Sequence, residues 1–216
     1  MGYSACLSHL PDWTATVGGS FRGFGVTFPK GCRQDVPYAL MIERQLRTLD
    51  ARRNALFDEL ASGSPEELGL RPSPGKWSIL EIVEHLVVAE GVVFLDFPPL
   101  ASLMARPRRW KHRFAYLVVY FVLRFGVRVQ TPSPKMNPEG GQSLDESRRR
   151  WDENLEHLRS YAAGLDRKAL RQALFRHPAV GPITLSQALT LDLLHLRVHA
   201  RQIRRLRRSS ATTTIE

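Results

Sequence analysis

The stretch from Thr184 to Arg208 constrains the fold most, because its pattern predicts one long amphipathic helix with two histidines inside it. Successive helical residues advance by about 100°, so His195 and His199 lie one turn apart on the same side. That side also carries Ala188, Leu191, Gln202, Ile203 and Leu206. The opposite side carries Arg197, Arg201, Arg204, Arg207 and Arg208, with Arg205 at the border. The two imidazoles therefore lie on the face that a helical bundle would bury, where both can reach one metal ion.

Three more amphipathic helices are expected upstream. The first runs from Pro37 to about Ala61, where leucines and isoleucines recur at three-, four- and seven-residue steps. The second begins at Ser78 and the third at Ser143. Capping boxes, in which a Ser or Thr is followed three residues later by Glu or Gln, mark the later starts: Ser78 with Glu81, Ser143 with Glu146, and Thr184 with Gln187.

A long crossover occupies residues 98–141. Its first part carries a basic patch, made of Arg106, Arg108, Arg109, Lys111 and Arg113. An apolar run from Phe114 to Leu123 follows, half the length of about 20 residues that a membrane-spanning helix needs. We therefore expect no membrane span. Two interpretations remain, a crossover helix buried against the bundle, which we favour, or an interfacial patch that touches lipid.

Four main helices, few strand signals and no internal repeat predict an all-α fold, a four-helix bundle with a long crossover between its second and third helices. The bundle should occupy residues 37–208. Residues 1–36 show no helical period and two glycine-rich patches, so we expect a poorly ordered N-terminal extension. Residues 209–216 are expected to form a disordered tail.

The charge balance is basic, with 31 Lys and Arg against 21 Asp and Glu, a net charge of +10. Such a chain suits nucleic acid, anionic lipid or acidic substrates, but a solvated arginine-rich surface explains the charge as well. We favour the second explanation and expect no sequence-specific nucleic-acid partner. Only Cys6 and Cys32 occur, and the start has no secretory pattern, so the expected location is cytoplasmic. The sequence leaves a homodimer open.

His85 lies near the start of the second helix, among alanine and valine. A histidine in such a place is commonly a satisfied core residue, and a histidine pair on a helix is common without metal. Together with His195 and His199, however, it would give a divalent cation three ligands and one open position, the arrangement of catalytic zinc sites. Gln202 and Asp192, one turn beyond either end of the histidine pair, are candidates to orient a ring. His177 is expected to be exposed in a turn.

Three short motifs resemble the DinB-like (YfiT-type) superfamily: Trp77-Ser78-x-x-Glu81-x-x-x-His85-Leu86, the turn His177-Pro178…Gly181, and His195-x-x-x-His199-x-x-Gln202-Ile203. The resemblance covers roughly residues 37–208. It implies an up-down-down-up bundle whose histidines, here His85, His195 and His199 by position, bind a divalent cation, commonly zinc or nickel. Characterised relatives include transferases and isomerases that use thiols such as bacillithiol, mycothiol or glutathione. The basic and then apolar crossover differs from the simplest members.

The leading hypothesis is a metal-dependent, thiol S-transferase-like enzyme, whose ion activates a low-molecular-weight thiol against an electrophilic substrate. A metal-dependent hydrolase would use the same open position for water. A non-catalytic basic helical module that binds nucleic acid or anionic lipid is a hypothesis of another class. The last hypothesis is a helical bundle that retains the metal site but catalyses no reaction. The sequence names neither the metal, nor the thiol, nor the electrophile.

Overall fold

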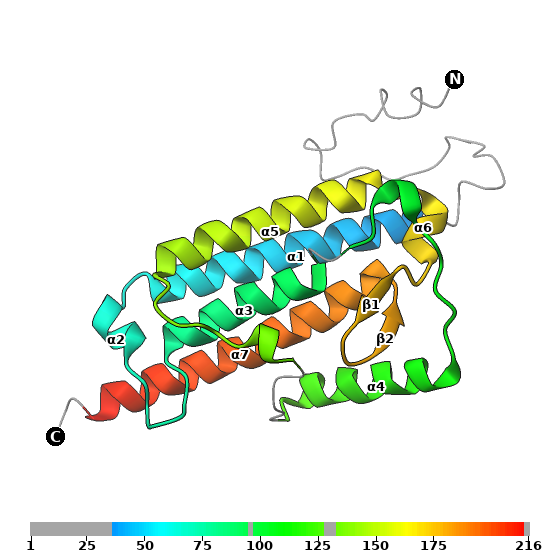
Figure 1. Ribbon diagram of the computed structural model, residues 1–216. Helices are drawn as coiled ribbons and strands as arrows, with labels where there is room; N and C mark the ends of the chain where they lie inside the picture. Colours follow the sequence, from blue (N-terminus) through cyan, green and yellow to red (C-terminus); the bar gives the residue numbers. More distant parts are fainter. Residues whose placement is uncertain (1–35, 95–96, 128–132, 214–216) are drawn as a thin grey trace, which may run out of the picture. The chain divides into compact units, whose positions relative to one another are not determined.

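The computed structural model describes residues 36–94, 97–127 and 133–213, and four long helices in it form a bundle (Figure 1). They are α1 (Val36–Leu60), α3 (Ile79–Phe94), α5 (Leu144–Gly164) and α7 (Leu185–Thr213). In Figure 1 α1 and α7 run one way and α3 and α5 the other, which is the up-down-down-up order. Around the bundle, α1 contacts α7 and α5, and α3 contacts the same two helices. The predicted all-α fold is confirmed.

Shorter elements connect these helices. They are α2 (Pro65–Gly69), the 3-10 turns Leu100–Ser102 and Pro134–Met136, α4 (Trp110–Phe125), α6 (Arg167–Arg171), and the strands β1 (Phe175–His177) and β2 (Gly181–Ile183). The strands pair antiparallel, so the expected turn is the tip of a small hairpin. The predictions for residues 1–35 and 214–216 lie outside the described residues. Helix α7 continues past Arg208 to Thr213, into the segment predicted as a tail.

Capping explains where the helices begin. The capping boxes at Ser78 and Thr184 are reciprocal. Each hydroxyl accepts a hydrogen bond from the backbone N–H of the residue three positions later. The side chain of that later residue accepts one from the backbone N–H of the capping Ser or Thr, and the four bonds measure 2.8–3.3 Å. At Ser143 only half the box forms, because the hydroxyl accepts from the Glu146 N–H while the Glu146 carboxylate binds Arg149. The three predicted start sites are thus correct to within one residue.

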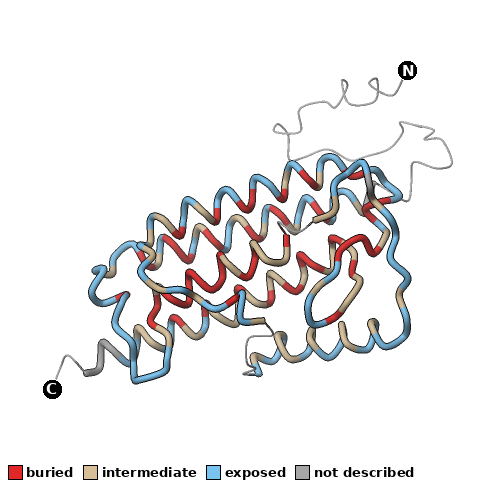
Figure 2. Tube along the Cα trace, in the orientation of Figure 1, coloured by how far each residue is buried: buried red, intermediate tan, exposed pale blue. Residues whose placement is uncertain are grey.

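The core lies along the facing stripes of the four long helices, shown in red in Figure 2. Its fully buried members include Leu49, Leu60, Ile82, Leu158, Leu189 and Ile203. Each such side chain contributes about 1.5–3 kcal/mol when it leaves water. Helix α3 is the most deeply embedded, since even Glu84 and Glu90 on it are buried. A buried carboxylate needs partners, and those of α3 help to build the site.

Helix α4 packs on α7 through one face only, with Ala115, Val119 and Leu123 against the core. None of its residues is buried. The favoured interpretation of a crossover helix buried against the bundle is therefore only half correct, because the opposite face of α4 meets solvent. Within the described ranges, no helix combines the length and hydropathy required to cross a membrane.

Candidate metal centre

His85 from α3 and His195 and His199 from α7 converge in one cluster. One ring nitrogen from each lies within 4.8 Å of those of the other two. The Nε2 atoms of His85 and His195 are 3.2 Å apart. His85 is buried, whereas the other two are partly exposed. The structure therefore brings together the three histidines that the sequence singled out.

Two of the rings are held by hydrogen bonds at their other nitrogen. His85 Nδ1 lies 2.6 Å from the carbonyl oxygen of Met136, and His199 Nδ1 lies 3.0 Å from Gln202 Oε1. Because a carbonyl oxygen only accepts, each Nδ1 carries the proton and each Nε2 keeps its lone pair. Gln202 thus lies where the sequence predicted, and both rings present an unprotonated nitrogen of the kind that binds metal.

The spacing of two of the donors fits a divalent cation. Two imidazole nitrogens on one tetrahedral zinc ion, at about 2.0–2.1 Å from it, would be about 3.3 Å apart. The His85–His195 separation of 3.2 Å is close to that value. At this separation one of the two Nε2 atoms can donate to the other, and with its proton on Nδ1 instead His195 would present an unprotonated Nε2 to a cation. A donor set of three imidazoles suits several divalent transition metals, zinc, copper, iron and nickel among them.

The electrostatics keep the cluster neutral. Burial lowers the pKa of His85 below its ordinary value of 6.5. Burial, followed by the neighbouring histidines, lowers the pKa of His195 further, and the same causes lower the pKa of His199 to about 4. A ligand must be unprotonated to bind a cation, so all three rings are ready to bind at neutral pH.

The return loop of the crossover supplies the carbonyl that orients His85. The Glu84 carboxylate accepts hydrogen bonds from the backbone N–H groups of Glu139 and Gly140, both at 3.0 Å. Gly140 has φ +85°, a left-handed conformation that favours glycine. These contacts anchor the loop to α3 beside Met136. Sequence reasoning missed this support, because a backbone carbonyl has no residue-type signature; the only signal is a carboxylate, Glu84, next to His85.

We expect Glu84→Ala to weaken metal binding about 10–100-fold, the range for changes that disturb the support of a ligand. Without the carboxylate the loop loses both anchoring bonds, and the Met136 carbonyl no longer fixes His85. Competition titration with a chromogenic chelator measures the affinity. Glu139→Ala is the matched control, because it removes an exposed carboxylate but keeps the backbone N–H. Equal affinities in the two variants would show that the loop does not support the site.

Asp192 does not hold a histidine. Its carboxyl group hydrogen-bonds that of Glu90 instead, in a second buried cluster to which each long helix contributes one side chain. Trp151 Nε1 donates to Glu90 Oε2 at 2.7 Å, and Arg53 lies over the Trp151 ring at 4.7 Å. Of the two candidates to orient a ring, Asp192 is thus engaged by Glu90 and by the charge of Arg53 in this structure.

Both carboxyl groups of this cluster have raised pKa values. Burial raises the pKa of Glu90 to about 7, against the influence of Arg53. Burial and the charge of Glu90 raise the pKa of Asp192 well above its ordinary value. Two carboxylates in contact repel, whereas a carboxylic acid can donate to its neighbour.

His177 is half-buried on β1 rather than exposed, which corrects the expectation from the sequence. Burial lowers its pKa to about 4, and its charge also lowers the pKa of His195. The Trp77 ring lies 4.9 Å from that of His85. Glu81 is engaged by Arg71 and by its capping bond to Ser78, so it is not free to serve the cluster.

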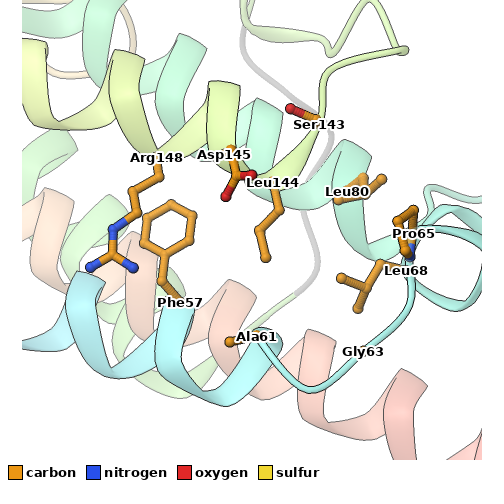
Figure 3. A pocket seen from close by; sticks show the side chains of 10 residues that line it. All are labelled: Phe57, Ala61, Gly63, Pro65, Leu68, Leu80, Ser143, Leu144, Asp145 and Arg148. Carbon is orange, nitrogen blue, oxygen red and sulfur yellow. The ribbon is translucent and has the colours of Figure 1, made fainter.

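The hollow in Figure 3, of about 300 Å³, lies away from the histidines. It is lined by Phe57, Ala61, Gly63, Pro65, Leu68, Leu80, Ser143, Leu144, Asp145 and Arg148. At one end Arg148 lies over the Phe57 ring, at 5.3 Å. A second hollow, of about 390 Å³, is bordered by Glu81 and Glu84. The chemistry of the three histidines, and not the volume of a hollow, identifies the candidate site.

A family model described as the DinB superfamily matches residues 45–203, which is more than half of the chain and includes all three histidines. Comparisons with curated proteins and with solved structures found no match.

Proposed function

The chain belongs to the DinB superfamily, and from this premise we propose that it is a divalent-metal-dependent enzyme that joins a low-molecular-weight thiol to an electrophilic substrate. One observation carries the proposal: three neutral imidazoles from two helices present donor atoms within 4.8 Å of one another. Structural metal sites usually have four protein ligands, whereas three leave a position for a reactant.

His85, His195 and His199 would hold the cation, zinc, nickel or similar. When bound, such an ion supplies the positive charge that keeps a thiol deprotonated at neutral pH. The chain itself fixes the rings: the Met136 carbonyl orients His85, and Gln202 orients His199.

The carboxylates near the cluster favour thiol transfer over hydrolysis. Among the described residues of α3 and α7, Glu81 caps a helix, Glu84 anchors the return loop, and Glu90 pairs with Asp192. Hydrolysis commonly employs a free carboxylate as general base, and these carboxylates are all engaged. A thiol held as thiolate needs no such base, because it is already the nucleophile.

The arginine face of α7 gives little support to a nucleic-acid module. Arg204 Nε donates to the Glu59 carboxylate at 2.8 Å, and Arg207 donates to the Glu59 carbonyl at 2.5 Å. Arg197 donates to the Arg124 carbonyl at 2.6 Å. Three of the five arginines thus tie α7 to its neighbours, and any binding to nucleic acid should be weak, without sequence preference, and steeply reduced by salt.

The test uses metal-loaded protein with glutathione and an aryl chloride activated by nitro groups. In transfer, the thiolate sulfur forms a bond to the ring carbon, chloride leaves with the bonding electrons, and the thiol proton goes to solvent. We expect mass spectrometry to show the thioether, formed in proportion to the enzyme. A screen of several thiols and electrophiles in which the products are only those of hydrolysis, at rates that added thiol does not change, would replace the transferase by the hydrolase.

A further inference from the structure

Helix α4 exposes an unbroken apolar stripe. Its exposed side chains include Trp110 at 80%, Phe114 at 62%, Phe121 at 49% and Phe125 at 71%. With Leu117 and Val118, which are also exposed, they fall within an arc of about 100° around the helix axis. The opposite arc packs on the bundle. Figure 2 accordingly shows α4 at the edge of the view with exposed and intermediate positions only. The stripe is too continuous to be scattered surface residues.

Positive charge borders the stripe on both sides. Lys111 lies just beyond one border, and Arg113 and Arg124 lie just beyond the other; all three are exposed. Within the described part of the chain, no carboxylate lies within ion-pair distance of these three side chains. The sequence between Phe97 and Pro138 contains eight lysines and arginines and no aspartate or glutamate. The surface around α4 therefore attracts anions, and no acidic residue of this segment neutralises the attraction.

We propose that α4 docks this protein on the surface of an anionic lipid bilayer, a function separate from that of the metal centre. The aromatic and aliphatic stripe would enter the boundary between headgroups and acyl chains, while the bordering cations contact anionic headgroups. Helix α4 has 16 residues, fewer than the roughly 20 that span a bilayer. It therefore lies in the plane of the surface, with its other face still packed on α7.

Two other occupants fit the stripe less well. A second copy docked by the same stripe would bring like charges together along both borders, and this segment offers no acidic residue to oppose them. The phosphates of duplex nucleic acid would pair with the cations. They would leave the broad apolar arc, with Trp110 and Phe114 at its start, against water and phosphate. Anionic lipid satisfies both the apolar arc and its charged borders.

The experiment is flotation of the full chain with vesicles of phosphatidylcholine alone or with about 30% phosphatidylserine. We expect binding to the anionic vesicles, little to the neutral ones, and a decrease with salt. Phe114→Glu should reduce binding at least about tenfold, since a phenyl group leaves lipid and an acid enters. Leu70→Glu, which changes an exposed leucine just after α2, is the matched control and should bind as wild type. Lys111→Gln with Arg113→Gln should lose about fivefold for each cation.

Absence of wild-type binding to anionic vesicles would overturn the proposal, whatever the variants do. Binding that Phe114→Glu and Leu70→Glu reduce equally would also overturn it, because the stripe would then have no special role. Sedimentation equilibrium tests the second copy: a dimer that Phe114→Glu dissociates, without vesicle binding, would assign the stripe to self-association. Saturable binding to oligonucleotides that is lost in the same variant, again without vesicle binding, would assign it to nucleic acid.

Discussion

The His85→Ala variant should lose thiol-dependent turnover by more than about 100-fold, beyond the range seen when only the support of a ligand is disturbed. The imidazole supplies one of three donors, and its Nε2 is only 3.2 Å from that of His195. With two histidines left on one helix, a cation would be held too weakly to keep a thiol deprotonated. Initial rates of thioether formation, measured over a series of metal concentrations, give the loss.

His157→Ala is the matched control, because this histidine is exposed on α5 and has no part in the cluster. It should retain wild-type rates. Circular dichroism should show that both variants keep their helices, since the apolar core does not depend on His85. Full activity in the His85→Ala variant, with its metal content unchanged, would remove this residue from the proposed ligand set.

The Arg53→Met variant should be about 3–5 kcal/mol less stable than wild type, the cost of breaking a buried ion cluster by removing one partner. Arg53 is only 1% exposed and lies beside Trp151, with Glu90 the charge that most affects it. Without the guanidinium, the paired carboxyl groups of Glu90 and Asp192 lose the positive charge that faces them. Urea denaturation gives the free energy of unfolding. Arg52→Met, at an exposed position one residue earlier, should change it by less than about 0.5 kcal/mol.

The cost of Arg53→Met should increase with pH. The pKa of Glu90 is raised from 4.5 to about 7 in the folded protein, so the folded state holds a proton that the unfolded chain releases between these values. The contribution of Glu90 to stability is thus present below pH 4.5 and lost as the pH rises toward 7. Above this window the ionised carboxylate depends on Arg53. A cost that is the same at about pH 5 and about pH 8 would show that Glu90 does not titrate between them.

The sequence predicts the bundle well because its signals are local and periodic. Capping boxes place the starts of α3, α5 and α7, and the apolar repeats of α1 and α5 coincide with buried residues such as Leu49 and Leu158. The histidines are predictable for the same reason, since helical periodicity puts His195 and His199 on one face. His85 is also expected from its place on the second helix and from the family resemblance, and the pairing of α3 with α7 brings it to the other two.

What the sequence does not reveal depends on contacts between distant segments. On a helical projection Asp192 and Gln202 both lie one turn from the histidine pair. Only Gln202 hydrogen-bonds a histidine, because Glu90 of α3 engages Asp192. The Met136 carbonyl has no identity in the sequence, and its place follows from the fold of the return loop. For α4, the apolar run predicts a helix but not which face packs on the bundle. The face that packs and the opposite face, which we propose to dock on lipid, are both apolar.

The most direct test of the three-histidine centre is the metal content of protein purified without chelators. Elemental analysis of wild type should find about one divalent ion per chain, and His195→Ala and His199→Ala should each reduce it to a small fraction while the helical content is kept. The His157→Ala control should keep the full content. Wild-type protein without stoichiometric metal, even after incubation with zinc or nickel, or variants that retain the wild-type content, would contradict the assignment of these histidines as ligands.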